Sequence, residues 1–301
     1  MTEPPVAEPS VTEPSAAESP VAAAPQTPAL ALGDDALVLS HRLGEWAGHA
    51  PVLEEEVALA NIALDLLGQA RVLLSLVGNE DELAYLREER AFCNCQLVEQ
   101  PNGDFAHTIA RQLYFSTYQR LLYERLASAA VADERPTPLA PLTPLTAPAA
   151  PAAPAALTAL AAKAVKEVDY HQDHARQWTL RLGDGTDVSH ARMQAACGNL
   201  WRFTGEMFQP LEGLKGLEGR EELEELDGTA GDAGIDWAAL ESDWLASVTS
   251  VLREATLTVP EGPRNGAWSA GAGRQGLHTE PFGRMLAEMQ HLHRSHPGAS
   301  W

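Results

Sequence analysis

The hydrophobic positions along this chain recur with the 3.6-residue period of an α-helix, and no segment alternates strictly as a half-buried strand does. Pro, Gly and Asp residues mark the points at which the periodic segments begin and end. Helices are predicted over about 35–49, 52–77, 102–128, 157–182, 188–208, 236–255 and 281–294, with a short helical connection at 80–90. The pattern therefore predicts an all-α protein.

Four of these helices fall into two pairs along the chain. The pair within 35–77 is separated from the pair within 102–182 by a long connection. Two helix pairs joined by a long crossover are typical of ferritin-like four-helix bundles. We therefore expect a ferritin-like four-helix bundle, followed by additional C-terminal helices.

Three segments interrupt the helical pattern. Residues 1–31 are mostly Pro, Ala, Glu, Ser and Thr, a composition that cannot bury enough apolar surface to fold. Residues 134–154 carry closely spaced prolines, which predict an exposed linker insertion. Residues 212–236 are strongly acidic and are expected to form a solvated loop. The expected organisation is a disordered tail over 1–31 and one ferritin-like domain over 32–301 that contains the linker.

The second predicted helix is apolar on almost every face, and three glutamates stand at its start, where carboxylates suit the helix dipole. Because such a helix belongs in a core, Asn61, Asp65 and Gln69 are expected to be buried polar groups. A glycine inside a helix costs about 1 kcal/mol relative to alanine. We therefore expect Gly68 to be present because it allows close helix packing.

The most specific candidate chemistry lies in the helix predicted over 157–182, where Glu167, His171 and His174 fall on one face. Ferritin-like carboxylate proteins hold two metals between four helices, which supply two lone Glu residues and two Glu-x-x-His motifs. The three-residue step keeps the carboxylate and the imidazole on the same face of the helix. Here Tyr170 stands three residues after Glu167, and the histidine comes one residue later.

The other ligand positions depart further from this signature. Gly68 stands three residues after Asp65, where a ligand histidine would be required. Glu45 is a candidate lone carboxylate of the first helix, although a pair with Arg42 or Arg71 is the favoured interpretation. The third long helix has glutamines and tyrosines in its middle and no central carboxylate.

The favoured interpretation is a structural hydrogen-bond cluster with no catalytic residue and no bound metal. Buried carboxylates are costly unless they are paired, so Glu167 and Asp65 should find Arg, His or Tyr partners at the bundle centre. The rival interpretation is an independent di-metal carboxylate oxidase with a non-standard ligand set that can include His174. The positions of this degenerate metal site are Glu45, Asp65, Gly68, Glu167, Tyr170 and His171.

Composition narrows the function classes. A formal charge of −21 with only three lysines argues against nucleic-acid binding, which needs clustered Lys and Arg. The N-terminal region lacks the basic start and apolar run of a secretory signal, and no charge-free stretch of about eighteen apolar residues indicates a membrane span. Cys93, Cys95 and Cys197 are odd in number and lack CxxC spacing, which argues against a disulfide or zinc framework. A cytoplasmic protein is expected.

Several stretches of the chain resemble one family closely. They include GDDALVLSHRLGEWAGHAP, ALANIALDLLGQAR, LVEQPNGDFAHTIARQ, AAKAVKEVDYHQDHARQW and LWRFTGEMF. These segments are similar to the C subunits of ring-1,2-phenylacetyl-CoA epoxidase, within the phenylacetate catabolism family. The likeness runs from about residue 32 to residue 301.

This resemblance implies a structural, non-catalytic subunit of a multicomponent monooxygenase that epoxidises the aromatic ring of phenylacetyl-CoA with O2 and NADPH. It also implies that a di-iron centre is held by a related catalytic subunit, which binds the phenylacetyl-CoA. A reductase with FAD and an iron–sulfur cluster would supply the electrons. No cofactor is expected in this chain itself. A third hypothesis is a helical interaction protein that is unrelated to oxygenases.

Four aromatic residues are candidates for an apolar partner surface. Obligate interfaces bury more than about 2,000 Å² and are rich in such side chains. Each of the four residues is nevertheless individually more consistent with a core position. They are Trp46, Trp201, Phe203 and Phe208.

Overall fold

Nine α-helices and no strand occur in the part of the chain that the computed structural model describes, which is residues 27–133, 153–211, 235–265 and 272–299. The all-α prediction is therefore confirmed. The helices are α1 (Pro28–Gly44), α2 (Leu53–Ser75), α3 (Glu80–Tyr85), α4 (Gln96–Glu99), α5 (Phe105–Asp133), α6 (Ala153–Gly183), α7 (Asp187–Trp201), α8 (Trp237–Glu254) and α9 (Glu280–Ser295).

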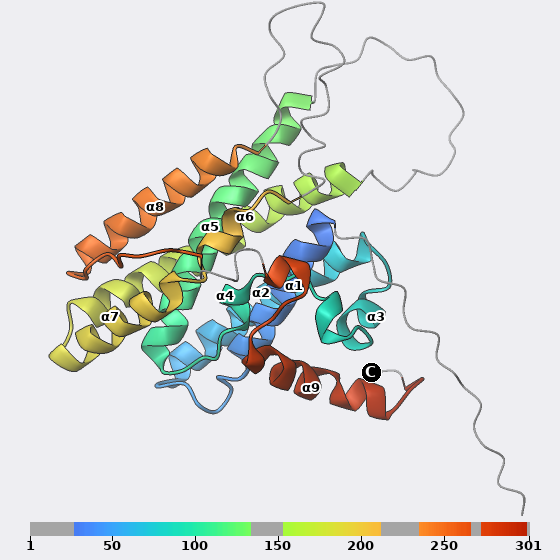
Figure 1. Ribbon diagram of the computed structural model, residues 1–301, viewed down its shortest axis with the longest axis horizontal. Helices are drawn as coiled ribbons and strands as arrows, with labels where there is room; N and C mark the ends of the chain where they lie inside the picture. The colour runs from blue at the N-terminus through green and yellow to red at the C-terminus, as the bar shows by residue number, and fades with distance from the viewer. Residues whose placement is uncertain (1–26, 134–152, 212–234, 266–271, 300–301) are drawn as a thin grey trace, which may run out of the picture.

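A four-helix bundle of α1, α2, α5 and α6 forms the centre of the molecule (Figure 1). The most extensive helix contacts are those between α1 and α2 and those between α5 and α6. The polar pairs Thr117–Gln172 and Arg120–Asp169 show that α5 and α6 run antiparallel. Two helix pairs joined by the long connection through α3 and α4 form the ferritin-like arrangement that the sequence predicts.

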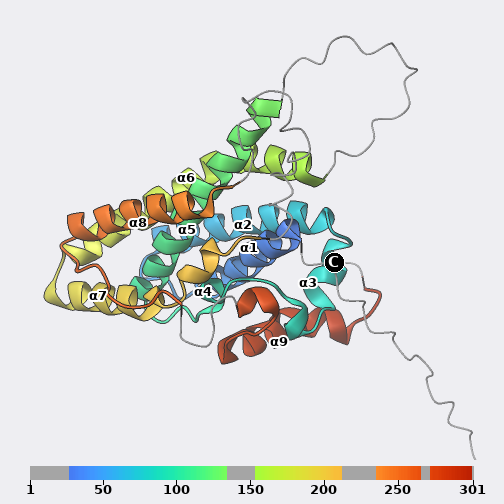
Figure 2. The same cartoon turned by 45° about the horizontal axis from the view of Figure 1, so that its top comes forward.

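The remaining long helices pack at two different sides of this bundle. The helices α7 and α8 lie against α5 and α6, whereas α9 packs on α3 at the other side (Figure 2). Side-chain caps fix several of these ends. Thr186 and Ser189 form a reciprocal capping box at the start of α7, and the Asp236 carboxylate accepts a hydrogen bond from Ala239 N at the start of α8. The helices predicted over 236–255 and 281–294 are therefore confirmed, whereas the helix predicted over 188–208 ends at Trp201 and is followed by a short 3-10 helix at Gly205–Phe208.

The first helix begins earlier than the sequence pattern predicts. Thr27 is its N-cap, since the Thr27 hydroxyl accepts a hydrogen bond from Leu30 N at 3.2 Å, and Pro28 occupies the first turn. The helix ends at Gly44, so the predicted span of 35–49 is shifted. Residues 28–31 are helical and contribute to the core, which corrects the predicted tail boundary at residue 31.

The two remaining interruptions lie largely outside the described residues. The predicted linker over 134–154 overlaps the start of α6, which begins at Ala153, and its other residues are not described. The same holds for most of the acidic segment over 212–236 and for residues 1–26. The structure therefore tests only the edges of these predictions.

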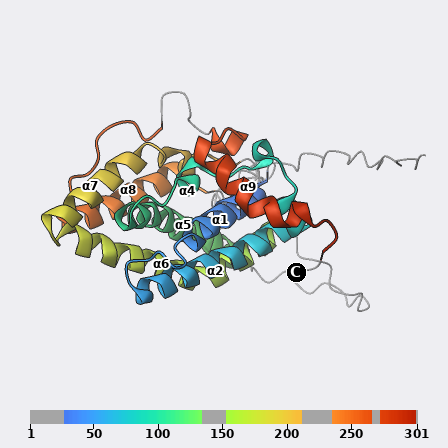
Figure 3. The same cartoon turned by 90° about the horizontal axis from the view of Figure 1, so that it is seen from below.

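The second helix lies at the edge of the bundle and is not enclosed by it (Figure 3). It packs on α1, α6 and α3, and its opposite face is exposed. Gln69 is buried, but Asn61 is exposed and the Asp65 side chain is 38% exposed, so the prediction that all three polar groups are buried is wrong. Gly68 is exposed as well. A Cβ atom added at Gly68 would meet nothing within 4 Å, so Gly68 does not serve close packing within this chain.

Helix α2 has a high mean hydropathy, because its exposed face carries apolar residues as its buried face does. Among the described residues, Leu53–Ser75 is long and apolar enough to cross a membrane by length and composition, and 44% of the relevant window is buried within the bundle. A core helix passes the same test, so this hydropathy is weak support for a membrane span.

Two of the four candidate interface aromatics belong to the core. Trp201 and Phe208 are buried and contact Trp244, while Trp46 and Phe203 are partly buried against the core. The core interpretation is confirmed for Trp201 and Phe208. The three cysteines are free and buried.

Candidate functional site at the bundle centre

A ladder of polar side chains joins α2 to α6 across the bundle. His171 Nε2 lies 3.1 Å from Asp65 Oδ2, and Gln69 Nε2 donates a hydrogen bond of 3.1 Å to Glu167 Oε2. The pairing of 65 with 171 and of 69 with 167 shows that these helices are antiparallel. The His171 side chain is only 1% exposed, and burial lowers the pKa of this imidazole despite the nearby Asp65 carboxylate.

Helix α5 extends this ladder with a second amide. Gln119 Nε2 donates a hydrogen bond of 2.9 Å to Gln69 Oε1, and the Tyr123 hydroxyl approaches the same oxygen at 3.5 Å. Burial raises the pKa of Tyr123, so its hydroxyl keeps its proton at neutral pH. The Gln69 amide therefore links the two helices, because its oxygen accepts from α5 and its nitrogen donates to Glu167 on α6. Such connected amides satisfy buried polar groups whose desolvation would otherwise be costly.

The structure brings only some of the predicted site residues together. Asp65, Glu167 and His171 lie together where α2 packs on α6, with His171 buried and the two carboxylates half-buried, and the Asp65–His171 contact confirms the predicted histidine partner of Asp65. The partner of Glu167 is the amide of Gln69, which is not one of the Arg, His or Tyr partners that the sequence predicts. His174 lies nearer the start of α2, where its Nε2 is 2.9 Å from Glu55 Oε2.

The other three predicted positions lie away from this centre. The Glu45 carboxylate contacts Arg42 Nη1 at 2.7 Å and Asn102 Nδ2 at 2.9 Å, which confirms the pair with Arg42. Tyr170 is 49% exposed, and Gly68 is exposed as well. Both inward-facing pairs are therefore four residues apart, at 65 and 69 and at 167 and 171. The positions that a Glu-x-x-His motif would give to histidine, three residues after Asp65 and after Glu167, are therefore on the outer faces of the two helices.

The groups at this centre do not fit a carboxylate-bridged di-metal site. Such a site needs four carboxylates and two histidines that converge from four helices. Here glutamine amides occupy the inward positions of α2 and α5, and no group of three His, Cys, Asp or Glu residues in the described ranges could hold a metal ion. Gln119 Oε1 and the Tyr118 hydroxyl are buried without a hydrogen-bond partner among the described residues, but both are neutral. The arrangement supports structural hydrogen bonding.

A second buried polar cluster lies on α1, and sequence reasoning missed it. The Arg87 guanidinium forms an ion pair with Asp34, and Cys93 N donates to the same carboxylate at 2.9 Å. Arg274 Nη1 and Nη2 donate to the two oxygens of Asp35 at 3.0 and 2.7 Å. Both carboxylates are buried and both have an arginine partner, as the high cost of an unpaired buried charge requires.

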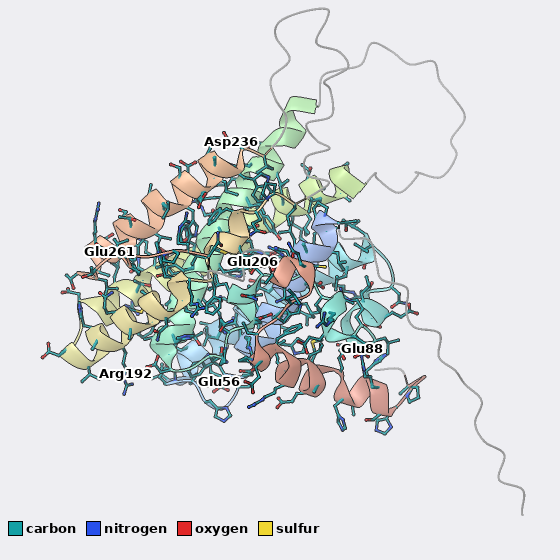
Figure 4. All side chains as sticks on the ribbon, in the orientation of Figure 1. Glu56, Glu88, Arg192, Glu206, Asp236 and Glu261 are labelled. Carbon is teal, nitrogen blue, oxygen red and sulfur yellow. The ribbon has the colours of Figure 1, made fainter. Side chains whose placement is uncertain are left out.

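The same cluster continues to α4 and the C-terminal segment. His278 Nδ1 lies 2.7 Å from Glu99 Oε2, and His278 Nε2 lies 3.1 Å from Phe92 O. Burial lowers the pKa of His278, but the bond to Glu99 and its charge outweigh that effect and raise the pKa overall. Glu206, which is labelled in Figure 4, is buried and accepts hydrogen bonds from Gln96 N and Arg274 N. This cluster fixes the segment around residue 274 to α1 and α4.

The sequence contains one signal of this cluster. Asp34 and Asp35 adjoin Gly33 and therefore look like the start of a helix. They are flanked on both sides by apolar residues, which is unusual for exposed acidic residues. Their arginine partners stand 53 and 239 positions away along the chain, so no local pattern could pair them.

A surface cavity of about 460 Å³ lies beside Glu45. Its charged lining is mixed, because Arg42 and Arg284 alternate with Glu45, Glu280 and Glu288. A lining with both signs of charge has no clear preference for an anion or a cation. The lining of this cavity therefore does not indicate a class of ligand.

Comparison with known proteins gives two concordant similarities. The PaaA/PaaC family model, described as phenylacetic acid catabolic protein, matches residues 10–134 and 146–301. The chain is also 45% identical over 278 residues to the C subunit of the 1,2-phenylacetyl-CoA epoxidase of Escherichia coli strain K12. That match covers 90% of this chain and 97% of the relative.

Proposed function

The chain belongs to the family of phenylacetic acid catabolic proteins, and from that premise we propose that it is a structural, non-catalytic subunit of a phenylacetyl-CoA epoxidase. In this role it supports and positions a catalytic subunit in the cytoplasm and oxidises nothing itself. The similarity to the C subunit of an epoxidase over nearly the full length of both chains supports membership of such a complex. Because that relative is a subunit, this chain is also expected to have partner subunits.

The amide ladder at the bundle centre is the observation that supports the non-catalytic part of this proposal. Gln119 Nε2 donates to Gln69 Oε1, and Gln69 Nε2 donates in turn to Glu167 Oε2, at the level of the bundle where a di-metal site would need carboxylates. Neutral amides are poor ligands for iron compared with carboxylates and imidazoles. They are well suited to joining helices, since each amide both donates and accepts.

The chemistry of the complex would then reside in its other subunits. We propose that a related catalytic subunit holds the di-iron centre and binds phenylacetyl-CoA. A reductase with FAD and an iron–sulfur cluster would pass electrons from NADPH to that centre. This chain would hold no cofactor of its own.

Metal analysis tests the proposal directly. The chain is purified alone and also co-expressed with the epoxidase catalytic subunit, and iron and manganese are measured in both preparations. We expect no stoichiometric metal in the chain alone and iron only in the stable complex, bound by the catalytic subunit. Near-stoichiometric iron or manganese in the isolated chain would overturn the proposal and favour an independent di-metal oxidase.

A substitution at Glu167 separates a structural role from a ligand role. Glu167→Ala removes the acceptor of the Gln69 amide and should lower the free energy of unfolding by about 1 kcal/mol, the typical net value of such a bond. Metal content should not change. Glu167→Gln is the matched control, because its amide oxygen can still accept the bond. Loss of bound metal in Glu167→Ala would contradict the structural role.

A further inference from the structure

The exposed face of α2 carries an apolar strip that nothing in the described chain covers. This outer strip of α2 consists of Leu53, Val57, Ala60, Leu64, Leu67 and Val72. Leu53 is 72% exposed and Leu64 is 64% exposed. More than half of the exposed large hydrophobic side chains in the described residues lie at or beside this strip. Apolar surface concentrated in this way marks an interaction site.

The spacing within the outer strip suits a second helix. Successive members from Leu53 to Leu67 are four, three, four and three residues apart, which is the repeat of helices packed side by side. Ala60 and Gly68 are small and exposed, and the space around Gly68 is open to 4 Å. Small residues on a helix face let another backbone approach closely. The strip therefore fits an elongated helical partner.

Charge distribution distinguishes the outer strip from other exposed helix faces. Between Val57 and Gly68 the one charged side chain of α2 is Asp65, which is 38% exposed and paired with His171, and the exposed charges of Glu54 and Arg71 lie toward the two ends of the strip. The outer face of α9, in contrast, carries Glu280, Arg284 and Glu288 at four-residue intervals. A face of the α9 kind is typical of a solvated helix, whereas an uncharged centre is typical of the core of an interface.

We propose that the outer strip of α2 is the docking site for a long helix of the epoxidase catalytic subunit, an inference that rests on the proposed function. The partner helix presents an uncharged apolar stripe of the same four-and-three spacing. Exposed Asn61 lies within the strip and pairs with a polar group of that helix. A lone polar residue in an apolar helix seam fixes the register of the two helices.

Two other occupants are less compatible with the charges of the chain. A second copy would bring together two molecules that each carry a formal charge of −21, and such like charges repel. A lipid bilayer with anionic headgroups would be repelled by the same charge and by Glu54 and Glu56 at the start of the strip. A less acidic protein partner meets neither obstacle.

The size of the strip indicates how much of the interface it can supply. Leu53 and Val72 are 19 residues apart, which corresponds to about 29 Å along a helix of about 10 Å width, or about 300 Å². A standard interface buries about 800 Å² on each partner. The strip is therefore the apolar core of a larger contact.

Binding to the purified catalytic subunit tests the proposal. The test variants are Leu64→Asp and the double variant Val57→Asp/Leu64→Asp, and Leu292→Asp on α9 is the matched control because Leu292 is also an exposed leucine, at 53%. Affinity is measured by isothermal titration calorimetry and complex formation by sedimentation velocity. We expect Leu64→Asp to weaken binding at least about 30-fold, as truncation of a central apolar residue does. The control should bind as the wild type does.

The outcomes separate this proposal from the proposed function. If the wild-type chain does not bind the catalytic subunit, the proposed function fails. If the wild type and both test variants bind equally, the docking site lies elsewhere and this inference is overturned while the proposed function stands. Self-association of the chain that Leu64→Asp abolishes, or sedimentation with anionic vesicles that it abolishes, would assign the strip to a different occupant and would also overturn the inference.

A labelling experiment avoids the introduced charge. The native cysteines are buried, and burial raises the pKa of Cys93 to about 11 and that of Cys197 to about 12, so all three should react slowly with maleimide. Leu64→Cys and Leu292→Cys each add one exposed thiol. The catalytic subunit should slow labelling at residue 64 at least about tenfold and leave labelling at residue 292 unchanged. Equal labelling at residue 64 with and without the bound partner would overturn the proposal.

Discussion

Removal of the Arg274 guanidinium should be among the most damaging single changes in the described part of the chain. Arg274 makes hydrogen bonds of 3.0 and 2.7 Å to Asp35, and it also donates to Ala31 O at 3.1 Å and to Cys93 O at 2.9 Å. The Asp35 and Arg274 side chains are 1% and 8% exposed. In Arg274→Met the Asp35 carboxylate would stay buried and lose its counter-charge.

The expected magnitude follows from this burial. Breaking a buried ion pair by removing one partner costs about 3–5 kcal/mol, because the remaining charge is left uncompensated. Asp35 keeps one hydrogen bond, from Cys95 N at 2.7 Å, which is too little to replace an arginine. We therefore expect Arg274→Met to lower the free energy of unfolding by about 4 kcal/mol. Arg284→Met is the control, because Arg284 lies on the exposed face of α9 and should change stability by less than about 0.5 kcal/mol.

Urea denaturation of a double-mutant cycle measures this effect. Asp35→Asn alone should also destabilise the chain, and the double variant Asp35→Asn/Arg274→Met should be less destabilised than the sum of the two single variants. Residues in direct contact typically show a coupling energy of about 0.5–3 kcal/mol, and we expect about 2 kcal/mol here. A loss below about 1 kcal/mol in Arg274→Met, or additive effects of the two substitutions, would refute the reasoning.

Two further predictions concern pH and backbone entropy. The His278 imidazolium should stabilise the fold fully below its unfolded-state pKa of 6.5 and progressively less as pH rises through its raised folded-state pKa, so the urea midpoint should fall above neutral pH. His278→Gln should flatten that pH dependence, and an unchanged profile would contradict the assignment. Gly68→Ala should raise the free energy of unfolding of the isolated chain by about 0.5–1 kcal/mol in the same assay, because the site is open and helical. Destabilisation by Gly68→Ala would instead indicate a packing role for the glycine.

The bundle centre could be predicted only in part. The sequence identifies Asp65, Glu167 and His171 as one polar group because their spacings place each helix's residues on one face, and the structure brings them together. It does not identify which glutamine faces them. The Gln69–Gln119 bond depends on how α2 and α5 are rotated about their axes, and that rotation is set by packing of the whole core.

Sequence alone therefore determined the helical content, the ferritin-like order of the helices and the family resemblance, since periodicity, capping residues and motif spacing are properties of neighbouring residues. The tertiary structure decided which side of α2 is buried. A helix that is apolar all round has no preferred inner face in its sequence, so contacts with α1 and α6 made that choice and left the outer strip exposed. The ion pairs of Asp34 and Asp35 were decided in the same way, because their partners are remote in sequence and meet them only in the folded core.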